Sequence, residues 1–319
     1  VIFMPVTTPG QKIDKTRLFG GDHVDIRLIG DFFDATLAAA QAFCAESGSH
    51  FLSPFDDDDV IEGQASVAVE MLDQMPEAPD LVILPVGGGG LSAGMLAYFR
   101  AIGTTPDIRY VEPAGGASLT AALAAGAPVT LPTLDSFVDG AAVARIGVRP
   151  FDILRQVPPQ HVLRIPENRL CITIQEMLNT EGIVLEPAGA LSIDALRDLG
   201  PEIEGRRIVC IATGGNFDFE RLPDVKERAM RFAGLKKYYV LRMPQRPGAL
   251  RDFLDILGPD DDIARFEYLK KSARNFGSVL IGIESREPQA FAQLETRMAE
   301  LGLAARDLTG DPLLSELVI

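Results

Sequence analysis

The stretch LVILPVGGGGLSAGMLAYF, residues Leu81 to Phe99, decides how the first part of this chain folds. An apolar run typical of a buried β-strand leads directly into four consecutive glycines, and a helix-compatible run follows from Leu91. Glycine is required where φ is positive or where another group comes close to the backbone. The junction therefore predicts a site at which a ligand or a packed segment lies against the main chain.

A helix that begins directly after such a glycine loop can bind an anion. Its first N–H groups have no partner within the helix, and the helix dipole favours negative charge there. A tight, closely packed turn is the alternative, but a run of glycines costs more chain entropy than such a turn needs. We therefore predict a phosphate site at residues 87–90.

The kind of phosphate ligand stays open at this point. A Walker loop is excluded because Met95 stands where that motif requires lysine. The dinucleotide fingerprint GxGxxA fits at Gly88, Gly90 and Ala93, with Glu112 where a ribose-binding acid belongs. An NAD-dependent dehydrogenase is thus an alternative, although a run of glycines satisfies GxG trivially.

Three more junctions combine small residues with the start of a helix or the end of a strand. CIATGGNFDF (210–219) repeats the strand-to-glycine pattern with Thr213 at the strand end. VLEPAGALS (184–192) places Glu186 beside a helix start, and FVDGAAVARIG (137–147) is the third. Ligands bind at the C-terminal edge of parallel sheets, where the Thr213 hydroxyl would lie. A turn hydroxyl and a helix-start acid are equally compatible interpretations of Thr213 and Glu186.

Segments typical of strands and helices alternate along the first two thirds of the chain, which predicts a mostly parallel sheet covered by helices on both faces. We expect strands at 1–6, 23–29, 50–55, 81–86, 108–113, 162–166 and 207–213. We expect helices at 10–19, 31–45, 62–75, from 91, at 166–180 and at 189–199.

The pattern changes at Lys236. The expected order is then strand 238–243, helix 247–257, strands 263–270 and 278–284, helix 287–301 and strand 304–308. This βαββαβ order predicts a ferredoxin-like unit.

The composition excludes several classes of function. The net charge is −15 and the pI about 4.7, so the surface repels nucleic acids and anionic membranes. No apolar run is long enough to span a membrane, and no signal peptide opens the chain. Because Cys44, Cys171 and Cys210 are scattered, neither disulfides nor a zinc site is expected, and the expected compartment is the cytoplasm.

Taken in order, PVGGGGLSAG, FVDGAAVARIG, EPAGALS and TGGNFDFERL resemble the fold-type II pyridoxal-phosphate enzymes, and most closely the biosynthetic threonine dehydratases (threonine ammonia-lyases). SPFDDDDVIEGQASVAVEML fits the same family, and RPGAL with IARFEYLKKSARNFGSVLIGIE is similar to its ACT-like regulatory domain. The resemblance implies two parallel or mixed sheets flanked by helices, with an incomplete small domain, and a C-terminal ferredoxin-like domain. The implied domains are 1–54, 55–232 and 233–319.

The resemblance also implies cofactor contacts. The loop that binds the phosphate of pyridoxal phosphate is matched by Gly87, Gly88, Gly89, Gly90 and Leu91. Thr213 matches the position, usually serine, whose hydroxyl meets the pyridine nitrogen, and Gly140 and Glu186 lie in the other cofactor-facing junctions. Related serine racemases bind a divalent cation near the position of Glu112, but Ser118 replaces the expected acid, so no metal is predicted.

One implied feature is an absence. In this family the Schiff-base lysine and a substrate-binding loop precede the segment that residues 1–6 match. The sequence has no lysine between Lys15 and Lys226, and Lys12 and Lys15 lie on a polar helix where we expect them to be solvated. We therefore expect this chain to be a fragment without a catalytic residue of its own, inactive as given.

The activity that the resemblance implies is deamination of L-threonine to 2-oxobutanoate and ammonia, the first step of isoleucine biosynthesis, with L-serine as a poorer substrate. Isoleucine would inhibit and valine would oppose it, through contacts at Arg246, Pro247, Gly248, Ala249 and Leu250, in a homotetramer. The alternatives are a serine dehydratase or racemase, the NAD-dependent dehydrogenase, and a non-catalytic amino-acid sensor.

Overall fold

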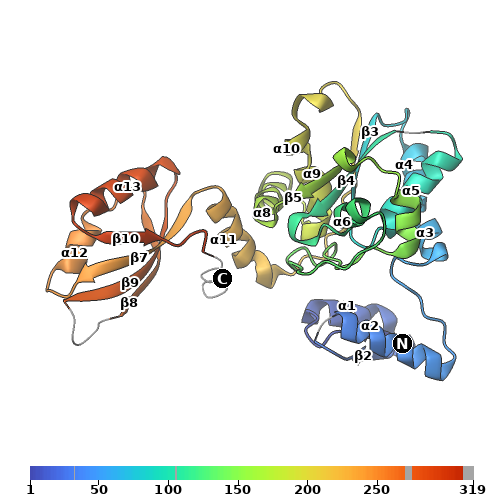
Figure 1. Cartoon of the computed structure of the whole chain (residues 1–319), viewed down its shortest axis with the longest axis horizontal. Coiled ribbons are helices and arrows are strands. Elements are labelled where there is room, and N and C mark those ends of the chain that lie inside the picture. The colour runs from blue at the N-terminus through green and yellow to red at the C-terminus, as the bar shows by residue number, and fades with distance from the viewer. Residues whose placement is uncertain (32, 105, 270–274, 312–319) are drawn as a thin grey trace. The chain divides into compact units, whose positions relative to one another are not determined.

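A computed structural model describes residues 1–31, 33–104, 106–269 and 275–311 (Figure 1). The chain divides into two compact units. Unit 1 comprises Val1–Ile165 and Leu185–Phe219, and unit 2 comprises Pro166–Val184 and Glu220–Ile319. The domain boundaries expected after residues 54 and 232 stay a prediction.

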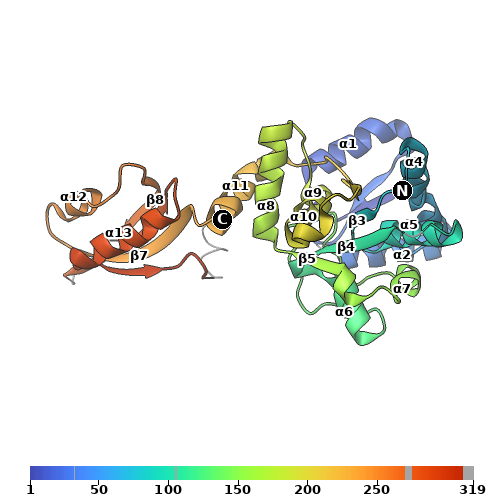
Figure 2. The same ribbon diagram turned by 90° about the horizontal axis from the view of Figure 1, so that it is seen from above.

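The main sheet of unit 1 is parallel throughout. Its strand order is β5-β4-β3-β6, and every neighbouring pair is parallel. Strands β3, β4 and β5 are labelled in Figure 2. The strands are β3 (Leu81–Pro85), β4 (Asp107–Pro113), β5 (Val162–Ile165) and β6 (Ile208–Cys210). The predicted parallel sheet is confirmed.

Strand β3 lies at the centre of this sheet and is buried along its whole length. Val82 and Leu84 pack with Ala93, Met95 and Phe99 of α5 (Gly90–Ala101). Side chains alternate along a strand, so Ile83 points to the opposite face, where α9 (Pro187–Asp194) contacts β3. Helices on both faces explain why the strand is continuously apolar.

Further elements complete unit 1. A small parallel sheet pairs β1 (Ile2–Met4) with β2 (Ile26–Leu28). The remaining α-helices described in unit 1 are α1 (Gly10–Gly20), α2 (Phe33–Ser47), α3 (Asp58–Gln64), α4 (Ser66–Gln74), α6 (Ser118–Ala125), α7 (Val148–Leu154) and α10 (Leu196–Leu199).

Two predictions near residue 55 are wrong. Residues 50–55 form no strand, because Pro54 has no N–H to donate and the Ser53 hydroxyl accepts from the Asp56 N–H at 3.0 Å, which makes a turn. The helix expected at 62–75 is two helices. The first begins early, because the Asp57 carboxylate caps it by accepting the N–H groups of Asp59 and Val60.

Unit 2 contains the predicted βαββαβ sequence. Its four-stranded antiparallel sheet has the order β10-β7-β9-β8. The elements are β7 (Lys236–Pro244), α12 (Ala249–Leu254), β8 (Asp262–Leu269), β9 (Phe276–Glu284), α13 (Gln289–Glu300) and β10 (Ala304–Asp307). The ferredoxin-like prediction is confirmed, and the predicted end of its second strand, Lys270, lies outside the described residues.

Helices α12 and α13 cover one face of this sheet, where apolar residues of β7 and β9 form the core with Phe253 and Phe291. Two more helices belong to unit 2 and pack on each other: α8 (Glu167–Glu176), which continues into a π-helical turn (Met177–Glu181), and α11 (Leu222–Phe232). Among the residues that the structure describes, no helix is long and apolar enough to cross a membrane.

Candidate cofactor site and regulatory pocket

Both conditions that require glycine, a positive φ and a close neighbour at the backbone, occur in the glycine loop. Gly89 has φ of 92°, in the left-handed region, directly before α5 begins. A β-carbon on Gly88 would lie 2.1 Å from Cγ of Phe55, and one on Gly87 would lie 3.0 Å from Cα of Ala141. The close packing considered from the sequence is therefore present, together with the tight turn.

The same loop leaves backbone donors unpaired at the start of α5. The first N–H to bond back is that of Ala93, which donates to the Gly89 carbonyl at 2.9 Å. The N–H groups of Gly90, Leu91 and Ser92 have no acceptor among the described residues. Gly90 and Ser92 are buried, and a buried N–H without a partner is costly. The helix start therefore fits a bound anion such as phosphate.

The other glycine junctions contact this loop in succession. The Gly147 N–H donates to the Gly88 carbonyl at 3.1 Å, which joins the 137–147 segment to the loop. In the same segment, a β-carbon on Gly140 would lie 2.9 Å from Cβ of Ala188 in α9. The segment thus bridges the phosphate loop and the helix that follows Glu186.

The junction after β6 completes this ring of contacts. The Glu186 N–H donates to the Gly214 carbonyl at 3.1 Å, and a β-carbon on Gly189 would lie 2.5 Å from the same oxygen. Thr213 is exposed just beyond the strand, so its hydroxyl is accessible to a ligand. The predicted strand to residue 213 ends at Cys210 instead. The four junctions found in the sequence are therefore neighbours in space.

Glu186 is the acidic group of this site. A β-carbon on Gly214 would lie 2.5 Å from Oε1 of Glu186, so only glycine leaves room for the carboxyl group there. Burial raises the pKa of Glu186, and the charge of Asp139 raises it further, whereas Lys12 and Lys15 lower it. The environment therefore stabilises the protonated form of Glu186 relative to an exposed glutamate.

Lys12 and Lys15 of α1 bond to distant residues at the rim of this site, while Lys15 stays exposed as expected. Lys12 Nζ lies 2.5 Å from Oδ2 of Asp139, beside Gly140. Lys15 Nζ donates to Oδ1 of Asn216 at 2.7 Å. No signal in the sequence links these residues, because the pairs are more than a hundred positions apart.

Glu112 is not available for a ribose. It is completely buried, and its Oε1 accepts the Leu119 N–H at 2.5 Å. Its Oε2 accepts the Thr120 N–H at 2.9 Å and the Thr120 hydroxyl at 2.7 Å. Because it accepts these N–H groups, Glu112 caps the start of α6, and burial raises its pKa. The Ser118 hydroxyl beside it donates to the Gly87 carbonyl at 3.3 Å. In the described part of the chain, no cluster of His, Cys, Asp and Glu could hold a metal ion.

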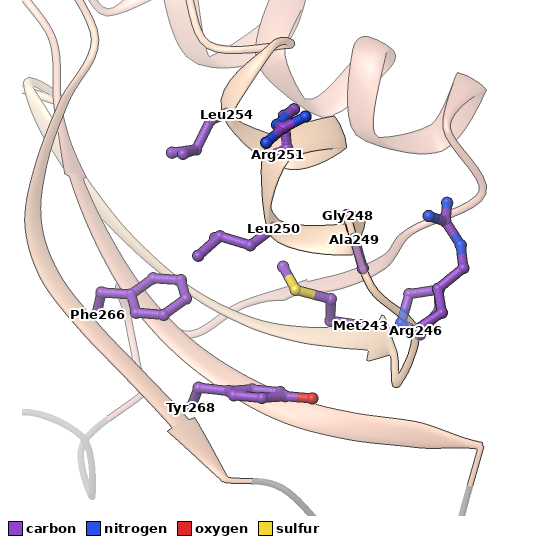
Figure 3. Close-up of a pocket in the computed structure, with 10 residues that line it drawn as sticks. Met243, Arg246, Gly248, Ala249, Leu250, Arg251, Leu254, Phe266 and Tyr268 are labelled. Atoms are coloured by element: carbon purple, nitrogen blue, oxygen red, sulfur yellow. The ribbon is translucent and has the colours of Figure 1, made fainter.

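Unit 2 has a pocket of about 440 Å³ between α12 and β8 (Figure 3). Of the predicted effector contacts, Arg246, Gly248, Ala249 and Leu250 line it, whereas Pro247 does not. The lining residues that the sequence did not indicate are Met243, Pro244, Arg251, Leu254, Phe266 and Tyr268. Most of the lining residues are apolar, and the guanidinium group of Arg246 pairs with Asp252 at 2.5 Å.

Comparison with known proteins assigns two stretches of the chain to families. Residues 1–214 match the model of the pyridoxal-phosphate dependent enzymes, and residues 227–318 match the C-terminal regulatory domain of threonine dehydratase. The chain belongs to the threonine dehydratase family. The resemblance and the fold class predicted from the motifs are confirmed, and the family cofactor is pyridoxal phosphate.

Individual relatives agree with this family assignment. The L-threonine dehydratase biosynthetic IlvA of Lactococcus lactis subsp. lactis is 44% identical over 322 residues, which cover 100% of this chain and 77% of that protein. The protein of the same name from Staphylococcus aureus (strain NCTC 8325) is 43% identical over 303 residues, 93% of this chain and 72% of the relative.

Among solved structures, the processed form of threonine deaminase isoform 2 from Solanum lycopersicum aligns with a TM-score of 0.65 and 36% identity. The alignment covers 71% of this chain and 65% of the tomato chain. The threonine dehydratase assignment and the occupied carboxylate of Glu112 both argue against the dinucleotide alternative.

Proposed function

We propose that this protein deaminates L-threonine to 2-oxobutanoate and ammonia with pyridoxal phosphate, as the first step of isoleucine biosynthesis in the cytoplasm. The observation that carries the proposal is the convergence of four glycine junctions at the unpaired N–H groups of α5, in a chain of the threonine dehydratase family. L-serine, which lacks the γ-methyl group, would be a poorer substrate.

In this proposal the glycine loop holds the cofactor phosphate. The N–H groups of Gly90, Leu91 and Ser92 donate to the phosphate oxygens, and the α5 dipole adds favourable charge. The close packing of Gly87 and Gly88 against Ala141 and Phe55 fixes the backbone that precedes these donors. When bound, pyridoxal phosphate supplies an electron sink for negative charge at the substrate α-carbon.

Thr213, Glu186 and Gly140 set the position of the cofactor ring in the proposal. The Thr213 hydroxyl meets the ring nitrogen and, as a neutral group, leaves that nitrogen largely unprotonated. Gly140 leaves room for Ala188 and Gly214 leaves room for the carboxyl group of Glu186, whose pKa is raised by burial. We assign the Schiff-base role to no lysine in the described part of the chain. That the Schiff-base lysine lies outside residues 1–319 stays a prediction.

The pocket of unit 2 is the proposed effector site. Leu250, Leu254 and Phe266 suit a branched aliphatic side chain, and the guanidinium group of Arg251 suits a carboxylate. Isoleucine would inhibit from this site and valine would oppose it, in a homotetramer.

The test uses the protein expressed from its complete gene. Removal of pyridoxal phosphate by hydroxylamine and dialysis should abolish keto-acid formation from L-threonine, and added cofactor should restore it. A rate that is unaffected by cofactor removal, or that requires NAD, would contradict the proposal. Calorimetric titration with isoleucine separates an enzyme with a regulatory pocket from the non-catalytic sensor, which would bind isoleucine without producing keto acid.

A further inference from the structure

A buried lysine helps to hold helix α11 against the sheet of unit 2, together with the hydrogen bond from Arg231 of α11 to the Thr309 carbonyl. Lys236, the first residue of β7, is 8% exposed. Its Nζ lies 2.5 Å from Oε2 of Glu227 in α11 and 2.9 Å from Oε1 of Glu284 in β9. Lys236 and Glu284 stand opposite each other in the antiparallel register. One ammonium group therefore joins the helix to two strands.

The second oxygen of Glu227 is also used. The hydroxyl of Tyr238, a buried residue, donates to Oε1 of Glu227 at 2.9 Å. Burial lowers the pKa of Lys236, but its hydrogen bonds to Glu227 and Glu284 outweigh this and raise the pKa overall. Removing the lysine would leave two poorly solvated carboxylates facing each other. This strongly destabilises the contact between α11 and the sheet, which we call the α11 joint.

Helix α11 in turn holds α8. The two helices pack along each other, and Nη1 of Arg228 in α11 donates to Oδ1 of Asn168 in α8 at 3.4 Å. Within unit 2, α8, α11 and the antiparallel sheet therefore form one connected block.

In the amino-acid sequence, the segments of this block adjoin residues of the candidate cofactor site. Val184, the last residue of the α8 segment in unit 2, is followed by Leu185 and Glu186. Helix α11 follows a 3₁₀ turn (Phe219–Arg221) that comes directly after the junction with Thr213 and Gly214. Residues 215–218 of that junction, which include Gly215, precede this turn, whereas Leu185 alone separates Val184 from Glu186.

Strand β7 links the joint to the effector pocket. Lys236 stands at its first position, and Met243 and Pro244 at its other end line the pocket. The strand is paired on both sides, by β9 and β10, and is therefore stiff. A ligand that moves the end of β7 acts on the same strand that holds Glu227.

We propose that Lys236 is the positioning residue that couples the effector pocket to the cofactor loops, by holding α11 against β7 and β9. The inference rests on the proposed function, because it assigns the route by which isoleucine inhibits. Lys236 contacts neither substrate nor effector in this assignment. Its loss should separate effector binding from inhibition.

The experiment compares inhibition curves of the full-length holoenzyme with calorimetric binding of isoleucine. Lys236→Met should bind isoleucine with nearly unchanged affinity and raise the concentration needed for half inhibition by about tenfold or more, within the usual range of coupling. Its kcat/KM for threonine without isoleucine should stay within about twofold of wild type. Lys236→Arg keeps the charge and should restore most of the inhibition.

The neighbouring lysine provides the matched control. Lys237 bonds to Glu295 of α13 and Asp307 of β10, on the opposite face from α11. Lys237→Met should be inhibited like wild type. If Lys236→Met is too unstable to assay, Glu227→Gln tests the same joint, because it keeps the side-chain shape and removes the charge.

The outcomes are distinguishable. A wild-type enzyme that isoleucine inhibits, together with an equally inhibited Lys236→Met or Glu227→Gln, would overturn the inference alone. Equal loss of inhibition in Lys237→Met would overturn it as well, because the effect would then be general weakening of the sheet. A wild-type enzyme that does not deaminate threonine, or that isoleucine does not inhibit, overturns the proposed function and this inference with it.

Discussion

The ring of Phe55 lies directly against Gly88: a β-carbon on that glycine would lie 2.1 Å from the Cγ atom of the ring. Phe55 also approaches Gly90, where a β-carbon would lie 3.2 Å from its Cα. One aromatic side chain thus packs on one side of the loop, while the first N–H groups of α5 stay unpaired. The packing fixes the backbone that the phosphate would meet.

Gly88→Ala should therefore weaken cofactor binding. The added methyl group has to displace the Phe55 ring, which costs about 1–3 kcal/mol and moves the loop. We expect the Kd for pyridoxal phosphate, measured by absorbance titration of the apoenzyme, to rise about tenfold or more.

Gly63→Ala is the matched control, because a β-carbon on Gly63 meets nothing within 4 Å and the residue lies in α3. It should leave the Kd unchanged and stabilise the fold slightly. A Gly88→Ala enzyme that binds the cofactor like wild type would show that the loop does not contact the phosphate.

Thr213 should act through its hydroxyl. Thr213→Ser keeps the hydroxyl group and should retain kcat/KM within about twofold, whereas Thr213→Ala should lose about tenfold, the effect of one hydrogen bond. Steady-state rates with L-threonine measure both. Equal activity of the alanine and serine variants would show that the Thr213 hydroxyl does not contribute to catalysis.

Leu254 should define the effector pocket. Leu254→Asp places a charge on its apolar wall and should raise the isoleucine concentration for half inhibition by about tenfold or more. Leu301 is similarly exposed, 40% against 44% for Leu254, but lies outside the pocket. Leu301→Asp should therefore leave the inhibition curve in place, and a matching shift in both variants would argue against this pocket.

The reactivity of the Cys171 and Cys210 thiols tests how well the fold protects them from solvent. Burial raises the pKa of Cys171 to about 12 and that of Cys210 to about 11, so both stay protonated well above neutral pH. At pH 8 iodoacetamide should alkylate Cys210 about a hundredfold and Cys171 about a thousandfold more slowly in the native protein than in concentrated urea, where thiol pKa values are near 8.5. Mass spectrometry of the labelled peptides measures this, and fast native labelling of Cys171 would contradict its packing in α8.

Local patterns predicted those parts of the fold that depend on neighbouring residues. Residues 238–308 combine strand-like apolar patterns with amphipathic helices, so the sequence was sufficient to predict the βαββαβ order. Residues 50–55 contain strand-forming side chains, but Pro54 and the Ser53–Asp56 turn override them. Helix α6 was missed because its start is stabilised by Glu112 on the preceding strand and not by a local cap.

The site was predictable only as separate pieces. Each glycine junction marked a close approach of the backbone, but not what approached it. The partners are Phe55 for Gly88, Glu186 for Gly214 and Ala188 for Gly140, and all lie far away in the sequence. The Glu227–Lys236 pair was missed for another reason, since charged residues at a helix–strand connection usually face solvent.

The central claim is tested most directly by the initial rate of 2-oxobutanoate formation from L-threonine, measured with increasing isoleucine on the full-length enzyme loaded with pyridoxal phosphate. We expect keto-acid formation that isoleucine inhibits to completion in a saturable manner. A loaded enzyme that forms no 2-oxobutanoate, or forms it at a rate that isoleucine does not change, would contradict it.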